Sequence, residues 1–70
     1  IAGEFMLNAL RLNDGFSLAQ FSARTSLPWE RVEEKVEALV ARKLLVRPGD
    51  TVRLSDLGRR FLDSVVAEFF

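Results

Sequence analysis

The hydrophobic and polar positions along the chain predict a first helix over residues 4–12. This stretch, EFMLNALRL, consists largely of strong helix formers, and its apolar side chains cover more than half of the helical wheel. Asn13 and Gly15 follow it and tolerate the left-handed conformation that ends many helices. So wide an apolar arc needs cover on two sides, and a domain this small is expected to supply only one. We therefore expect Met6 or Leu10 to stay exposed or to touch another chain.

Residues 18–25 are predicted to form a second helix. Ser17 and Gln20 give the S-x-x-Q form of a capping box, and Phe16 and Phe21 stand at the positions of a hydrophobic staple. Phe16 and Ser17 can also supply one short extended segment before the helix.

A third helix is predicted over residues 28–43, after a tight turn at residues 26–27. Pro28 suits the first helical position, because the N–H that it lacks would be unpaired there. Apolar side chains then recur at helical spacing, at Trp29, Val32, Val36, Leu39 and Val40. Two helices joined by so short a turn have the spacing of a helix-turn-helix.

Two short, largely apolar or β-branched runs, residues 44–47 and 51–54, are predicted to pair as a β-hairpin. Between them, Pro48-Gly49-Asp50 has the composition and the length of a hairpin turn. Ser55 can then cap a last helix over residues 56–69, which carries most of its apolar side chains on one face.

Together these elements predict a mainly α fold with a small β-hairpin, namely a winged helix: a helix-turn-helix followed by a wing. We expect four helices, with a possible third short strand at Phe16 and Ser17. Gly58 lowers helix propensity in the first turn of the last helix, so a close approach of another backbone is its expected compensation. The residues predicted to form the core are Phe5, Leu18, Phe21, Val36, Leu39, Leu54, Phe61 and Val65.

Length and composition narrow the classes of function. The 70 residues, 49% of them hydrophobic, suit a single small domain, residues 1–70. The sequence has no Cys and no His, which excludes disulfides, thiolate or imidazole metal ligands, and the commonest nucleophiles and proton shuttles. We therefore expect no catalytic residue, no metal site and no cofactor in this chain. The 10 basic and 10 acidic residues cancel, so bulk charge does not favour binding to nucleic acid or to an anionic membrane.

The chain is expected to be a piece of a longer, soluble protein. No apolar run approaches the ~20 residues of a membrane span. The start, Ile1-Ala2-Gly3, has no initiator Met and no signal-peptide layout.

The outward face of the third helix bears on DNA binding, because that face would enter the major groove. Glu30 and Glu34 lie near its centre, with Arg31 and Lys35 toward its flank. Carboxylates at the centre of a docking face repel phosphates, so we expect no specific nucleic-acid binding. Glu30/Glu34 and Arg31/Lys35 are like-charge i,i+4 pairs, and such strips suit a partner surface, although a solvated helix face is the commoner explanation.

Trp29, Arg47 and Arg53 each allow a binding role and a plainer one. An exposed Trp29 would suit an anchor for a partner or a nucleobase, but its wheel position places it in the core or at the core edge. Arg47 and Arg53 on the wing could touch phosphates, yet two arginines beside Asp50 make a thin patch. Solvated hairpin charges are the preferred interpretation.

Two parts of the chain are specific enough to indicate a family. The first runs from Glu4-Phe5-Met6-Leu7 to Arg11-Leu12 with Gly15. The second, LSDLGRRFL at residues 54–62, is similar to an ending of the form L-[ST]-x-x-G-x-x-[FL]-[LI]. With them, almost the whole chain closely resembles the C-terminal domain of the oxygen-independent coproporphyrinogen III oxidase-like family. Trp29 departs from that family, in which a smaller aliphatic residue is more typical.

The resemblance implies a parent that is a cytoplasmic radical S-adenosylmethionine protein, with a 4Fe-4S iron-sulfur cluster and S-adenosylmethionine in an upstream barrel. It implies a role in haem and porphyrin biosynthesis as an oxidoreductase or, in a sister branch, as a haem chaperone. The C-x-x-x-C-x-x-C cluster ligands of the family lie in that barrel. Since this chain has no Cys, no cluster, cofactor or catalytic residue maps onto it.

The sequence therefore predicts an accessory winged-helix domain of a larger haem-related enzyme or chaperone, docking on the upstream catalytic barrel of the same polypeptide. The residues predicted to make this contact are Met6, Leu10, Glu30, Glu34, Arg31 and Lys35. The alternative is a stand-alone winged-helix DNA-binding domain of a transcription regulator. A protein–protein adaptor outside haem metabolism would use the same surfaces, and the residues do not distinguish an oxidase parent from a haem chaperone.

Overall fold

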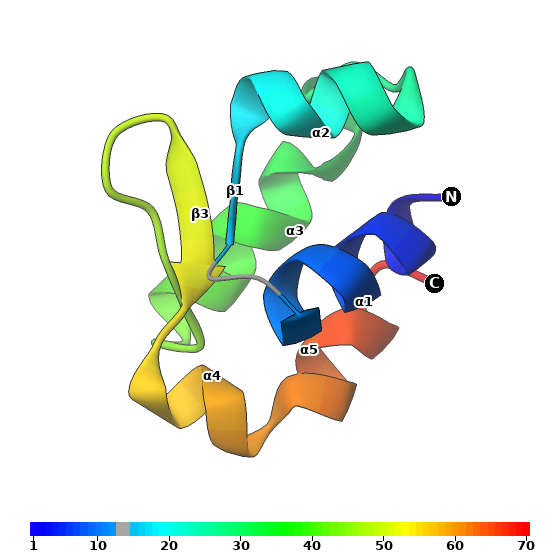
Figure 1. Cartoon of the computed structure of the whole chain (residues 1–70). Coiled ribbons are helices and arrows are strands. Elements are labelled where there is room, and N and C mark those ends of the chain that lie inside the picture. The colour runs from blue at the N-terminus through cyan, green and yellow to red at the C-terminus, as the bar shows by residue number, and fades with distance from the viewer. Residues whose placement is uncertain (13–14) are drawn as a thin grey trace.

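Residues 1–12 and 15–70 are described by the structure, a computed structural model of the chain. They form mainly helices, with a small antiparallel sheet of three short strands (Figure 1). In chain order the elements are α1 (Ala2–Leu12), β1 (Phe16–Ser17), α2 (Leu18–Thr25), α3 (Glu30–Ala41), β2 (Leu45–Val46), β3 (Thr51–Leu54), α4 (Asp56–Arg60) and α5 (Leu62–Ala67).

The sheet confirms both the predicted hairpin and the third strand. The strand order is β1-β3-β2, and both pairs are antiparallel. In the hairpin Leu45 lies opposite Leu54, and β2 is shorter than the predicted run of residues 44–47. On the other side of β3, Phe16 lies opposite Val52, so the sheet ties the segment before α2 to the hairpin.

α2 begins with the predicted capping box. Ser17 Oγ accepts a hydrogen bond from the Gln20 N–H at 3.1 Å, and Gln20 Oε1 accepts one from the Ser17 N–H at 2.8 Å. The helix ends at Thr25, whose buried hydroxyl donates to the Phe21 carbonyl at 2.7 Å and accepts from the Leu27 N–H at 3.1 Å. These local bonds fix the tight turn that leads to α3.

α3 is shorter than the helix predicted over residues 28–43. Pro28 lies before the first turn rather than at the first helical position. Lys43 lies beyond the helix end, with a left-handed φ of 67°. The Leu44 N–H then donates to the Leu39 carbonyl at 3.0 Å, which is the long bond of a Schellman motif.

The last helix, predicted over residues 56–69, is broken into α4 and α5 at Phe61. Ser55 caps α4 as predicted, because its Oγ accepts from the Gly58 N–H at 2.9 Å. Phe61 then leaves the helical region, with φ −122° and ψ 33°. The break turns α5 back so that it lies along α1 (Figure 1). The expectation of four helices is therefore wrong, since the described residues form five.

Gly58 lies where another backbone approaches closely, as expected. A Cβ at this position would be 2.9 Å from the carbonyl carbon of Leu44 and closer still to its oxygen. That oxygen also accepts the Ser55 N–H at 3.1 Å, while Ser55 Oγ donates to the Lys43 carbonyl at 2.6 Å. The start of α4 is thus clamped onto the turn between α3 and β2.

Gly15 supplies the positive φ that was expected after α1. Its φ is 111°, and its N–H donates to the Ala9 carbonyl at 3.3 Å. Asn13, the other candidate for this role, lies outside the described residues.

The core is formed by residues of all three strands and of α1, α2, α3 and α5, with further residues from the segments next to them. Its buried members are Met6, Ala9, Leu10, Phe16, Phe21, Val32, Val36, Leu39, Leu44, Leu45, Val52, Val65 and Phe69. Of the residues predicted for the core, Phe21, Val36, Leu39 and Val65 are buried, and Phe5, Leu18 and Leu54 pack against them partly buried. Aromatic rings join the elements edge to face, with centroids 5.3 Å apart for Phe5–Phe21 and 5.7 Å for Phe21–Trp29.

Two predictions about burial are wrong. Met6 is 0% exposed and Leu10 is 5% exposed, because α1 packs against α2 on one side and against α5 on the other. The domain therefore covers the wide apolar arc of α1 by itself. Phe61, predicted for the core, is 50% exposed, because the backbone break removes it from the buried face of the last helix.

Candidate functional site

The outward face of α3 carries the charges that the sequence placed there. Glu30, Arg31, Glu34 and Lys35 are all exposed, and within the described residues none of the four forms a salt bridge. They are therefore accessible to a partner, and their role in docking stays a prediction.

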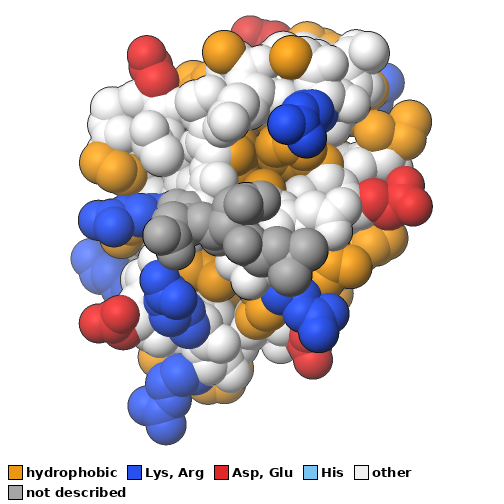
Figure 2. Space-filling view, viewed as in Figure 1, with side chains coloured by type: hydrophobic (Ala, Val, Ile, Leu, Met, Phe, Trp, Pro, Cys, Tyr) orange, Lys and Arg blue, Asp and Glu red, His pale blue; other side chains and the backbone are white. Residues whose placement is uncertain are grey.

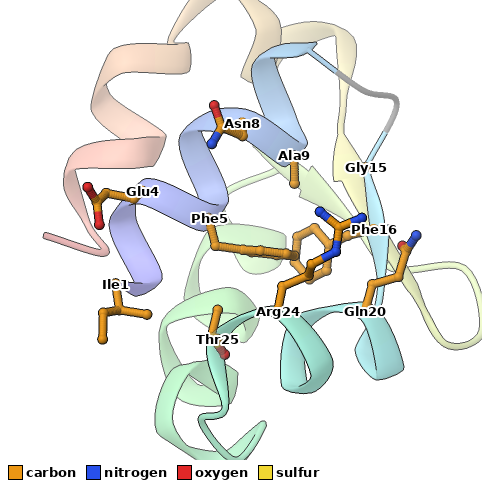
Figure 3. A pocket seen from close by; sticks show the side chains of 10 residues that line it. All are labelled: Ile1, Glu4, Phe5, Asn8, Ala9, Gly15, Phe16, Gln20, Arg24 and Thr25. Atoms are coloured by element: carbon orange, nitrogen blue, oxygen red, sulfur yellow. The ribbon is translucent and has the colours of Figure 1, made fainter.

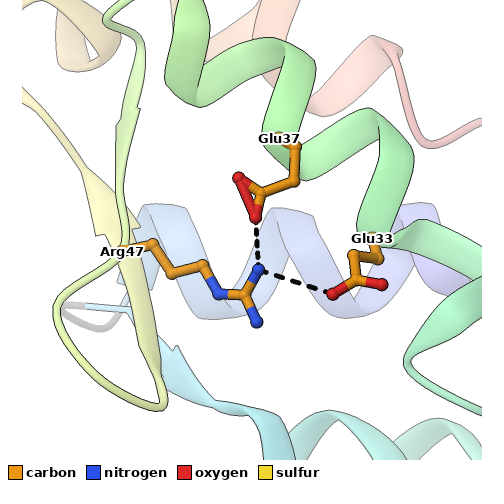
Figure 4. A network of polar contacts seen from close by, with 3 residues as sticks. All are labelled: Glu33, Glu37 and Arg47. Atoms are coloured by element: carbon orange, nitrogen blue, oxygen red, sulfur yellow. Dashed lines mark hydrogen bonds and ion pairs between the residues drawn. The ribbon is translucent and has the colours of Figure 1, made fainter.

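Two further glutamates on α3, Glu33 and Glu37, have a partner inside the domain. The Arg47 guanidinium, from the hairpin, pairs with Glu37 and lies 3.6 Å from a carboxylate oxygen of Glu33 (Figure 4). The same guanidinium lies 5.2 Å from the centroid of the Trp29 ring, within the range of a cation–π contact. We call these four residues the Arg47 cluster. It joins the hairpin to α3 and engages the hairpin arginine that a phosphate would otherwise meet.

Trp29 lies at the core edge, as its position on the helical wheel indicated. Its ring packs against Phe21 and Phe16, with centroids 5.7 Å and 6.4 Å away. Its Nε1 is buried and has no hydrogen-bond partner among the described residues. The ring therefore acts as a packing surface for the core on one side and for Arg47 on the other.

Met6 and Leu10 do not line a docking surface. Both side chains were predicted to be accessible to the upstream domain, and both are buried within this domain. The interdomain contact predicted for them is therefore wrong.

A groove of about 510 Å³ opens between α1, β1 and α2 (Figure 3). Its floor carries the rings of Phe5 and Phe16, which meet edge to face at 5.0 Å. The sides carry the opposite charges of Glu4 and Arg24, and Figure 3 shows Arg24 reaching across the groove toward the two rings. The sequence reading did not find this groove, because it is formed by side chains from elements that are separate in sequence.

A second concave surface lies beside the break between α4 and α5. Its lining is Arg42, Leu44, Leu57, Phe61 and Ser64, around a hollow of about 260 Å³. Leu57 is 40% exposed and Phe61 is 50% exposed, although both belong to the apolar stripe of the sequence. We call this surface the Phe61 face. Figure 2 shows several Lys and Arg side chains on the lower left of the molecule, on the side where Figure 1 places α4.

The described part of the chain holds no group of three or more Asp, Glu, His or Cys side chains arranged to bind a metal ion. Among the described helices, none combines the length and the apolar character that crossing a bilayer requires. The surfaces described above offer apolar and ionic contacts.

A family comparison identifies the class of protein more closely. The family model described as the HemN C-terminal domain matches residues 1–61. The chain therefore belongs to this family, the C-terminal domain of HemN-like coproporphyrinogen oxidases, as the resemblance indicated. A domain of this family is the C-terminal part of a larger protein. No curated protein and no solved structure gave a significant match to the chain.

Proposed function

We propose that this chain is an accessory domain that docks on the catalytic domain preceding it in the parent protein and carries no catalytic residue itself. The observation that carries the proposal is the family match over residues 1–61. It is supported by the composition, since a chain without Cys or His lacks the usual cluster ligands and proton shuttles.

We further propose that the fold is a winged helix, folded as one domain over residues 1–70. α2, its tight turn and α3 follow one another as in a helix-turn-helix, and the β2–β3 hairpin follows α3 as a wing does. β1 pairs with β3 on the side away from β2, which adds the third strand.

The parent would be a cytoplasmic radical S-adenosylmethionine protein of porphyrin or haem metabolism, either an oxidase of coproporphyrinogen III or a haem chaperone. Its 4Fe-4S cluster and S-adenosylmethionine would be held upstream of this chain. Within this arrangement the domain contributes binding surface and stability to its parent, and every redox step takes place elsewhere.

A cut between the two domains tests the docking proposal. A protease site is inserted into the full-length parent just before Ile1, and the cut protein is passed over a sizing column at micromolar concentration. If the domain docks, the two pieces elute together and separate only in denaturant. Two separate peaks from the cut protein, with no change in the stability of the remaining domain, would contradict the proposal.

A second measurement separates an accessory role from a catalytic one. The cut parent is assayed for cluster content, for S-adenosylmethionine binding and for coproporphyrinogen oxidation or haem binding. We expect the cluster to remain bound after the cut. Substitutions confined to the exposed charges of this chain should leave the chemistry of a docked parent intact, whereas loss of the cluster from such variants would assign the chain a direct role.

A further inference from the structure

The Phe61 face is an exposed apolar surface of this domain that adjoins a hollow. Leu57 and Phe61 are 40% and 50% exposed and lie four residues apart, Leu57 in the first turn of α4 and Phe61 directly after its end. Exposed apolar patches beside a hollow mark binding sites more often than they occur by accident. The hollow of about 260 Å³ next to Phe61 has room for one apolar side chain of a partner.

The charge near this face is basic. Arg42 lines the hollow, and no other charged residue of the described ranges 1–12 and 15–70 does. On α4, Arg60 follows Leu57 by three residues and therefore lies beside it on the helix surface. The carboxylates nearest in sequence, Asp56 and Asp63, are exposed on α4 and α5 and do not line the hollow. A partner that fills the hollow would therefore meet the Arg42 guanidinium in its lining, with Arg60 on the adjoining surface of α4.

We propose that the Phe61 face binds an acidic segment of the preceding domain of the parent protein, with one apolar side chain in the hollow and carboxylates against Arg42 and Arg60. This inference rests on the proposed docking function and names the surface that performs it. Carboxylates suit these two side chains, because Arg presents a planar set of donors that matches a carboxylate with two hydrogen bonds.

Two other occupants fit the same surface less well. A second copy of this chain, related by a two-fold axis, would bring Arg42 and Arg60 of both copies together, and like charges oppose that contact. Nucleic acid would find only a narrow basic patch, on a domain whose net charge is zero and whose α3 face exposes Glu30 and Glu34.

The groove between α1, β1 and α2 indicates the chemistry of a partner less clearly than the Phe61 face does. Glu4 and Arg24 line it together, so it has no net charge to select a partner. The preference for the Phe61 face therefore comes from its single sign of charge and from its exposed aromatic ring.

The test uses the full-length parent with the protease site before Ile1. Phe61→Asp and Arg42→Glu are each expected to weaken re-association of the cut domains by at least about tenfold, as for anchor residues at interfaces. The matched controls are Phe70→Asp, at a ring that is 75% exposed near the chain ends, and Arg53→Glu, at an exposed arginine on β3. Both controls should re-associate like the wild type. Circular dichroism of the released variant domains checks that each one is folded.

The outcomes distinguish this inference from the function on which it rests. If the wild-type pieces separate, both proposals fail. If the wild-type pieces stay together and Phe61→Asp and Arg42→Glu have no effect on re-association, the docking proposal stands and the Phe61 face is excluded. If Phe70→Asp alone weakens re-association, the contact surface lies at the chain ends and the inference is wrong. Two further results would also overturn the inference. The first is that the released domain forms a dimer and Phe61→Asp abolishes it. The second is that the released domain binds a fluorescent single-stranded or duplex oligonucleotide and Phe61→Asp abolishes that binding.

Discussion

The guanidinium of Arg47 lies 5.2 Å from the centroid of the Trp29 ring, so the hairpin and the start of α3 are held together by one side chain. The same group pairs with Glu37 and faces Glu33 (Figure 4). The Arg47 side chain is 22% exposed, whereas those of the two glutamates are 45% and 50% exposed. Solvent therefore reduces the contribution of the ion pairs to stability more than it reduces the contribution of the ring contact.

The first prediction concerns Arg47. Arg47→Ala should lower the free energy of unfolding by about 1–2 kcal/mol, the sum of a partly screened ion pair and a cation–π contact. Urea unfolding measures it. Raising the salt concentration should remove part of the difference, since screening acts on the ion pairs first. Glu37→Gln, which keeps the ring contact, should cost less than Arg47→Ala; an equal cost would mean that the ring contact contributes nothing.

The second prediction concerns Gly58, where helix propensity and packing have opposite effects on the stability of an alanine variant. Ala at a helical position is favoured over Gly by about 1 kcal/mol, so propensity alone predicts that Gly58→Ala is stabilising. The Leu44 carbonyl occupies the space of the new methyl group, and overpacking of this kind costs typically about 1–3 kcal/mol or more. We expect Gly58→Ala to lower the melting temperature.

Ser22→Ala, at an exposed position of α2, is the matched control for Gly58→Ala, because it changes propensity without a clash. It should leave the melting temperature unchanged or raise it slightly. A rise in melting temperature for Gly58→Ala would show that the α3–β2 turn moves freely away from α4.

The features predicted correctly from the sequence are those decided by a few neighbouring residues. Ser17 and Gln20 cap α2 and Ser55 caps α4, because each cap depends on bonds to residues close by in the chain. The strand at Phe16, which pairs with the distant Val52, was expected only as an option. The close approach at Gly58 was also expected, since a glycine inside a helical turn needs a reason.

The features predicted wrongly depend on how distant elements pack. The wheel of a single continuous last helix placed Phe61 on the buried face, and nothing local marked the break that exposes it. The same break brings α5 beside α1 and buries Met6, a residue 55 positions before Phe61. In the candidate site, the exposure of Glu30 and Glu34 followed from the wheel, whereas the Arg47 cluster required knowledge of where the hairpin folds.

The third prediction compares one substitution at a buried and at an exposed position. Met6→Asp places a carboxylate at a site that is 0% exposed, and burying an unpaired charge costs several kcal/mol, which exceeds the margin of a small domain. We expect the released domain to lose its cooperative thermal transition. This outcome is the reverse of what the exposure expected for Met6 from the sequence would give, since a carboxylate at an exposed position leaves a fold intact.

Phe61→Asp is the control for Met6→Asp, because its side chain is half exposed. The released variant should keep a cooperative transition, measured by circular dichroism. A folded Met6→Asp domain, or an unfolded Phe61→Asp domain, would show that the burial of these two residues is misassigned.

The last prediction concerns nucleic acid. Since Glu30 and Glu34 lie exposed on the α3 face and Arg47 is engaged by Glu37, we expect no specific duplex binding and only weak association in ~50 mM salt. Fluorescence anisotropy of a labelled duplex, titrated with the released domain, measures this association.

A double variant, Glu30→Lys together with Glu34→Lys, reverses the sign of the charge on this face of α3 without touching the core. This variant should bind the duplex more tightly, with an affinity that falls as salt rises, because each added lysine can displace a phosphate counterion. Submicromolar, salt-sensitive binding by the wild-type domain would instead mean that Arg53 and the other exposed basic residues suffice to hold DNA against the acidic centre of α3, and the prediction of no specific duplex binding would be wrong.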